Sequence, residues 1–126
     1  MTSIASRLSP GLQKTLAELG YTQLTPVQEQ AIPCLLDGRD VIAQSKTGSG
    51  KTAAFALPLL NRLTSASRRT QALILYPTQK LCAQVAREVR KFGHRQANLQ
   101  VLAVSSGQPF RPQAHALEKG VHVVVG

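Results

Sequence analysis

Short runs of apolar and often β-branched residues alternate along this chain with longer stretches of helical spacing. The runs lie at residues 41–44, 72–76, 99–104 and 121–125. The stretches between them lie at residues 50–63, 79–92 and 112–119. Strands that are separated by helices usually pair in parallel, because the crossover helix returns the chain to the same end of the sheet. The sequence therefore predicts an α/β fold with a parallel sheet flanked by helices.

Two more helices are predicted before the first run. Ser9-Pro10 and Thr25-Pro26 each combine an N-cap residue with a first-turn proline. We expect Gly20 to close the first helix in a left-handed conformation and Pro33 to kink the second. With 126 residues, 43% of them hydrophobic, the chain can bury a single core, so we expect one domain over residues 1–126. The chain stops directly after a strand, which indicates a truncated fragment of a longer domain.

The chain is strongly basic. Fifteen Lys and Arg residues against six Asp and Glu residues give a formal net charge of +9. Such a balance attracts phosphates, whether of nucleic acid, nucleotide or anionic lipid, but charge alone does not choose among them. In the predicted helix at 79–92, Arg87, Arg90 and Lys91 fall opposite the apolar positions, so a solvated helix face explains them as well as RNA contact does.

Cysteine usage and hydropathy indicate a cytoplasmic protein. Cys34 and Cys82 share no metal-ligand spacing with the three histidines, so free, reduced thiols are expected. The longest uncharged apolar run, residues 53–60, is far shorter than the roughly 20 residues that cross a bilayer. The N-terminus also lacks the apolar core of a signal peptide. We expect a soluble protein with no membrane partner.

The segment SKTGSGKT fits the phosphate-binding loop pattern, with serine at the first position where glycine is commoner. It lies between a predicted strand and a predicted helix, where a curled backbone and a helix N-terminus present N–H groups to an anion. Lys51 is expected to reach the outer phosphates and Thr52 to ligate Mg²⁺, which makes both of them candidate catalytic residues. The candidate phosphate-binding residues are Ser45, Lys46, Thr47, Gly48, Ser49, Gly50, Lys51 and Thr52.

A phosphate loop does not identify the base of the nucleotide. The segment GYTQLTPVQ, residues 20–28, offers an aromatic ring at Tyr21 and an amide at Gln28. An amide can match the N6 and N7 edge of adenine in bidentate fashion. However, Thr25 and Gln28 also have the spacing of a capping box, in which Gln28 would only satisfy the backbone. Both interpretations stay open from the residues alone.

Four ordered motifs give the chain a family resemblance. GYTQLTPVQ, SKTGSGKT, YPTQKL and SSGQPF together resemble the first RecA-like lobe of DEAD-box RNA helicases, and most closely its DbpA type. The resemblance implies a RecA-like P-loop NTPase fold, ATP and Mg²⁺ as cofactors, and RNA, structured or ribosomal, as a partner. It also implies a second helicase lobe in the full-length chain. The residues it implies for adenine recognition are Tyr21, Thr25 and Gln28, and those for RNA contact are Pro77, Thr78, Gln79 and Gly107.

Some positions depart from the family pattern. Ser3 stands where the family usually has an aromatic residue of the adenine pocket, Gln79-Lys80 replaces an Arg-Glu pair, and Ser106-Gly107 replaces Gly-Gly. These changes affect the RNA contact more than the ATP contact.

The family's Asp-Glu-Ala-Asp segment would lie beyond residue 126, as would its arginine fingers. We therefore expect the ATP-binding part of a helicase, inactive by itself. The alternative is a non-catalytic nucleotide- or RNA-binding remnant. A third candidate, a small-molecule kinase with a phosphate loop, is disfavoured, because such an enzyme has no use for Gln28 in the segment TPVQ.

Overall fold

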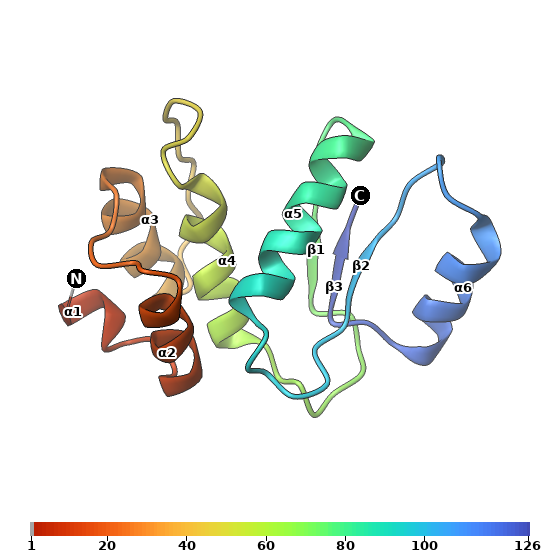
Figure 1. Ribbon diagram of the computed structural model, residues 1–126, viewed down its shortest axis with the longest axis horizontal. Helices are drawn as coiled ribbons and strands as arrows, with labels where there is room; N and C mark the ends of the chain where they lie inside the picture. The colour runs from red at the N-terminus through yellow and green to blue at the C-terminus, as the bar shows by residue number, and fades with distance from the viewer. Residues whose placement is uncertain (1) are drawn as a thin grey trace. The chain divides into compact units, whose positions relative to one another are not determined.

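The computed structural model describes residues 2–126 (Figure 1). It describes side chains from residue 4 onward. The chain divides into two compact units, Met1–Arg62 and Leu63–Gly126. The first is helical and carries the candidate nucleotide site, whereas the second contains the sheet and the candidate RNA residues.

The first unit consists of the helices α1 (Thr2–Ala5), α2 (Pro10–Glu18), α3 (Pro26–Leu36) and α4 (Lys51–Arg62). Helix α2 starts as predicted, because the Ser9 hydroxyl accepts a hydrogen bond from the Leu12 N–H at 3.4 Å. Gly20, at φ 79°, follows α2 in the predicted left-handed conformation. Helix α3 continues through Pro33 to its last residue.

Helix α3 packs against α4 and thereby fixes the start of α4, where the phosphate loop ends. Small residues on α4 allow this close approach. A hydrogen bond of 2.8 Å from the Ser9 N–H to Asn61 Oδ1 ties the beginning of α2 to the far end of α4. The buried apolar side chains of this unit are Leu8, Leu12, Leu16, Ala31, Ile32, Ala53, Ala54, Ala56, Leu57 and Leu60.

Residues 41–44 do not form the buried strand that their apolar character predicted. They have no regular secondary structure, and the Ile42 side chain is 102% exposed. A strand exists only when a neighbour accepts its ladder of hydrogen bonds. No strand among residues 2–126 pairs with this segment, so its apolar sequence alone does not produce a strand.

The second unit is a parallel three-stranded sheet with two helices, as the alternation of strands and helices predicted. Strands β1 (Ala72–Ile74), β2 (Val101–Ala103) and β3 (Val123–Val125) alternate with helices α5 (Gln79–Phe92) and α6 (Phe110–Lys119). Their order in the sheet is β1-β3-β2. Val125 of β3 is in register with Ile74 of β1 and Ala103 of β2, so the carboxyl ends of all three strands meet at one edge.

Helix α5 packs against β2 and β3 (Figure 1). No side chain of α6 is buried. The buried residues of α5 are Cys82, Val85, Ala86, Val89 and Phe92. Among residues 2–126, no helix is long and apolar enough to span a membrane.

A buried histidine lies at the amino-terminal end of the strands, opposite the carboxyl ends. His122, 2% exposed, accepts the Gln100 N–H at its Nδ1 over 3.0 Å. Because Nδ1 is an acceptor, the proton of the neutral ring lies on Nε2, which is 3.2 Å from the Ser65 carbonyl oxygen and donates to it. His122 thus joins the residues preceding β2 and β3 to the start of the second unit.

Candidate functional site

The phosphate loop curls just before helix α4. Gly48 and Gly50 have φ values of 81° and 88°, in the left-handed region where residues with a side chain are strained. Helix α4 begins immediately afterwards, at Lys51. The unpaired N–H groups of its first turn therefore point back toward the loop, which is the usual arrangement of an anion site.

Three hydrogen bonds within the loop connect its two ends. The Lys51 ammonium donates to the Ser45 carbonyl oxygen at 2.6 Å, and the Ser45 and Ser49 hydroxyls are 2.5 Å apart. The Ser49 N–H also bonds to the Lys46 carbonyl oxygen at 3.3 Å. Serine at the first motif position therefore supplies a link across the loop that the commoner glycine lacks.

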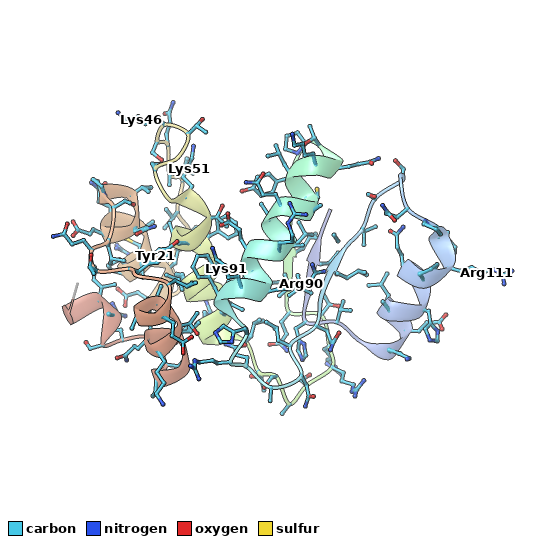
Figure 2. All side chains as sticks on the ribbon, in the orientation of Figure 1. Tyr21, Lys46, Lys51, Arg90, Lys91 and Arg111 are labelled. Carbon is cyan, nitrogen blue, oxygen red and sulfur yellow. The ribbon has the colours of Figure 1, made fainter. Side chains whose placement is uncertain are left out.

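The groups of this loop fit a nucleoside triphosphate with Mg²⁺. Lys46, Thr47 and Lys51 are exposed, and Thr52 is half-buried on the first turn of α4. Figure 2 shows Lys46 and Lys51 at the loop that leads into α4. Ammonium groups and backbone N–H groups bind phosphate oxygens, while a hydroxyl oxygen suits a hard cation such as Mg²⁺.

Gln28 connects the candidate base-binding segment to the phosphate loop. Its side chain is 2% exposed. Its Oε1 accepts the Thr25 N–H at 3.0 Å, while its Nε2 donates to the Gly50 carbonyl oxygen at 3.1 Å. A Cβ at position 50 would lie 2.3 Å from this Nε2, so only glycine allows the approach. The structure thus brings together the two motifs that the sequence singled out.

The Gln28 bonds bear on the two interpretations of this residue. The bond to Thr25 is the one that a capping box predicts. Thr25 has the matching position at the N-cap of α3, but its hydroxyl oxygen is buried without a well-formed hydrogen bond to any described residue. Gln28 therefore caps the helix and also braces the loop. Adenine recognition by Gln28 stays a prediction.

The other predicted base-binding residue, Tyr21, is half-buried directly after α2. Its backbone N–H donates to the Leu16 carbonyl oxygen at 2.9 Å, which fixes the chain as it leaves that helix. The side chain of Ser3, where the family pattern has an aromatic ring, lies outside the described part of the structure.

Three of the predicted RNA residues lie in the loops that follow β1 and β2, at the carboxyl end of the sheet, and the fourth, Gln79, is the first residue of α5. Pro77, Thr78 and Gln79 are exposed, and Thr78 caps α5 by accepting the Leu81 N–H at 3.2 Å. Gly107 is exposed on the other loop. The structure therefore brings the four predicted RNA residues to one edge.

A side-chain hydrogen bond joins the start of α5 to the loop after β2. Gln79 Nε2 donates to the Ser106 hydroxyl at 3.0 Å, and a Cβ at Gly107 would lie 2.3 Å from Gln79 Oε1. Two of the positions that depart from the family pattern, Gln79 and Ser106, are thus in contact. The sequence analysis treated these two changes as independent and did not predict the Gln79–Ser106 hydrogen bond. The fact that both positions differ from the family pattern could have indicated that they are in contact.

Comparison with known families agrees with this geometry. A family model described as DEAD/DEAH box helicase matches residues 25–126. The chain belongs to this helicase family.

Individual DEAD-box relatives match over nearly the whole chain. The chain is 46% identical over 118 residues to the ATP-dependent RNA helicase DbpA of Escherichia coli, covering 94% of this chain and 26% of that protein. It is 50% identical over 111 residues to the RNA helicase CrhR of Synechocystis, covering 88% of this chain and 22% of that protein. The chain therefore spans about a quarter of the length of these relatives.

Solved DEAD-box structures share the fold. A DEAD-box protein from Methanococcus jannaschii superposes with a TM-score of 0.88 at 35% identity, over 94% of this chain and 32% of that one. An RNA helicase from Chaetomium thermophilum bound to ADP gives a TM-score of 0.82 at 39% identity, over 94% of this chain and 30% of that one. The predicted RecA-like α/β fold, with a parallel sheet flanked by helices, is confirmed.

Proposed function

We propose that this chain is the ATP-binding part of an ATP-dependent DEAD-box RNA helicase. In the full-length protein, ATP binding and hydrolysis would drive the local unwinding of an RNA duplex. The observation that carries the proposal is the hydrogen bond from Gln28 to the Gly50 carbonyl oxygen, because it joins a base-binding motif to a phosphate loop within one unit. Family membership supports the same conclusion.

The phosphate loop supplies the charge and the donors for the triphosphate. Lys51 leaves the Ser45 carbonyl oxygen and pairs with the outer phosphates, while the backbone N–H groups at Gly48 and Gly50 bind the inner ones. The Thr52 hydroxyl would hold Mg²⁺. When bound, Mg²⁺ neutralises charge on the phosphate oxygens.

We propose that Gln28 also reads adenine, with the hydrogen-bonding capacity that its two bonds leave unused. Its amide has two N–H donors and two acceptor lone pairs, and its two hydrogen bonds use one of each. One donor and one acceptor are left, which is the combination that adenine presents at N7 and N6. Tyr21 would stack on the base.

The loops after β1 and β2 would bind the RNA backbone through Pro77, Thr78, Gln79 and Gly107. Their position at one sheet edge and the chain's net charge of +9 support a phosphate-rich partner. We propose a structured or ribosomal RNA as the target. Free thiols at Cys34 and Cys82 agree with a reducing, cytoplasmic location.

We further propose that these 126 residues bind ATP without hydrolysing it. The sequence has neither Asp nor Glu between residues 41 and 87, so neither the phosphate loop nor helix α4 contributes a carboxylate of its own. Phosphoryl transfer depends on positioned charges and on a residue that orients the attacking water. The same observation favours the second candidate function, a non-catalytic nucleotide- or RNA-binding protein. In the helicase proposal, a second lobe and the catalytic carboxylates complete the site.

Replacement of Lys51 tests the nucleotide site. We expect Lys51→Ala to weaken binding of a fluorescent ATP analogue at least roughly tenfold, because a charge-assisted bond is worth about 1.5–3 kcal/mol. Lys14→Ala, at an exposed lysine on α2, is the matched control and should bind as the wild type does. Equal affinity in Lys51→Ala and the wild type would refute the phosphate-loop assignment.

Steady-state ATPase measurements with and without RNA test the proposal that these residues do not hydrolyse ATP. RNA-stimulated turnover by a monomer of these 126 residues would refute the proposal that they do not hydrolyse ATP. In the full-length protein, RNA-stimulated turnover supports the helicase proposal, whereas its absence favours the non-catalytic one.

A further inference from the structure

The loop at residues 105–109, between β2 and α6, is held by one side chain from α6. Gln113 Oε1 accepts the Ser105 N–H at 3.1 Å, and Gln113 Nε2 lies 3.0 Å from the carbonyl oxygens of Ser105, Gln108 and Pro109. The amide thus pairs with both the N–H and the C=O of Ser105, as a neighbouring strand would. Its two N–H hydrogens serve three acceptors, so one hydrogen is shared.

The backbone of this loop does little to hold its own shape. The Gln108 N–H lies 3.4 Å from the Ser105 carbonyl oxygen, which is longer than the usual 2.7–3.2 Å. Val104 is tied firmly to the sheet, because its N–H donates to the Val125 carbonyl oxygen at 2.8 Å. The shape of the loop after this anchor therefore depends mainly on Gln113.

The same loop carries Ser106 and Gly107. Ser106 accepts the hydrogen bond from Gln79 Nε2, and the missing side chain of Gly107 leaves room for Gln79 Oε1. The two loops can interlock in this way only if residues 105–109 keep their conformation. A chain of contacts therefore runs from Gln113 through the loop to Gln79.

We propose that Gln113 is a positioning residue for the RNA site: it fixes the loop at 105–109 so that Gly107 and Gln79 present one continuous surface to the RNA backbone. The inference rests on the proposed function, in which these two residues contact RNA. Gln113 acts through the loop and does not itself touch the RNA.

The role requires an amide. A methionine of similar length has neither the N–H groups nor the strong acceptor, so Gln113→Met removes all of the bonds while it preserves the size of the side chain. A glutamate keeps the acceptor for the Ser105 N–H but turns a carboxylate oxygen toward the three carbonyl oxygens, which repel it. Gln113→Glu should therefore perturb the loop at least as much as Gln113→Met.

The experiment combines amide hydrogen exchange by NMR with RNA affinity, measured on the purified chain with a fluorescein-labelled single-stranded oligouridylate. We expect Gln113→Met to speed exchange of the Ser105 amide and to weaken RNA binding about tenfold, which is about 1.4 kcal/mol. Affinity for the ATP analogue should not change. Gln84→Met, at an exposed glutamine on α5, is the matched control and should leave all three measurements at their wild-type values.

Other results would contradict the proposed role of Gln113 or the proposed RNA contact. Unchanged exchange at Ser105 in both variants would overturn the positioning role, and so would faster exchange with wild-type RNA affinity. If Gln113→Met does not fold, Gln113→Glu supplies the same comparison, and loss of folding in both variants would make Gln113 a general stability residue and overturn the proposal. If the wild type binds no RNA, the proposed RNA contact is refuted, and with it the role of Gln113 in RNA binding. The exchange rate of the Ser105 amide then shows only whether Gln113 holds the loop.

Discussion

Replacement of Gln28 by alanine separates the structural role of this side chain from its role in choosing the base. Gln28 is 2% exposed, and its amide bridges the Thr25 N–H and the Gly50 carbonyl oxygen. Alanine removes both hydrogen bonds and leaves these two backbone groups without that partner. The phosphate loop then loses its connection to the start of α3.

The structure sets the size of the expected effects. Two hydrogen bonds at about 0.5–1.5 kcal/mol each predict a loss of about 1–3 kcal/mol in the free energy of unfolding. At about 4 °C per kcal/mol for a chain of this size, the melting temperature should fall by about 4–12 °C. If the remaining donor and acceptor of Gln28 read adenine, the preference for ATP over GTP should also fall, by about 1–3 kcal/mol.

Two measurements on the same variant test these effects. Thermal unfolding followed by circular dichroism gives the stability, and competition of ATP and GTP against a fluorescent ATP analogue gives the base preference. Gln30→Ala is the matched control, because this glutamine is exposed on the same helix. An unchanged melting temperature would refute the bracing role of Gln28. A lower melting temperature with wild-type base preference would refute adenine recognition and leave the capping role alone.

Two further substitutions test the second unit. Gly107→Ala should weaken RNA binding several-fold, because the new Cβ would displace Gln79 Oε1 and break the Gln79–Ser106 bond. The free energy of unfolding should change by less than about 1 kcal/mol, because the exposed Gln79 side chain can move aside. Fluorescence anisotropy with labelled RNA measures the first effect, and RNA affinity equal to the wild type would contradict the interlock. His122→Ala should lower the free energy of unfolding, measured by urea titration, by about 2–4 kcal/mol, since it removes the hydrogen bonds to Gln100 and Ser65 and leaves a buried cavity. A loss below about 0.5 kcal/mol would show that His122 does not stabilise the amino-terminal end of the sheet.

The sequence by itself determined the features that depend on near neighbours. The cap at Ser9 and the left-handed Gly20 follow from the conformational preferences of single residues and their adjacent positions. The alternation of strands and helices predicted the parallel sheet, because a crossover helix returns the chain to the same end of the sheet. The four motifs also identified the helicase family without any coordinates, because their order and residue types are written in the chain.

Only the tertiary structure decided which distant groups meet. Gln28 and Gly50 are 22 residues apart, and Gln79 and Ser106 are 27 apart, so no local pattern predicts either hydrogen bond. The segment at residues 41–44 shows the converse, because its strand-like sequence forms no strand without a neighbour to pair with. Backbone conformation responds to adjacent residues, whereas a hydrogen bond needs its partner in place, and the fold supplies that partner.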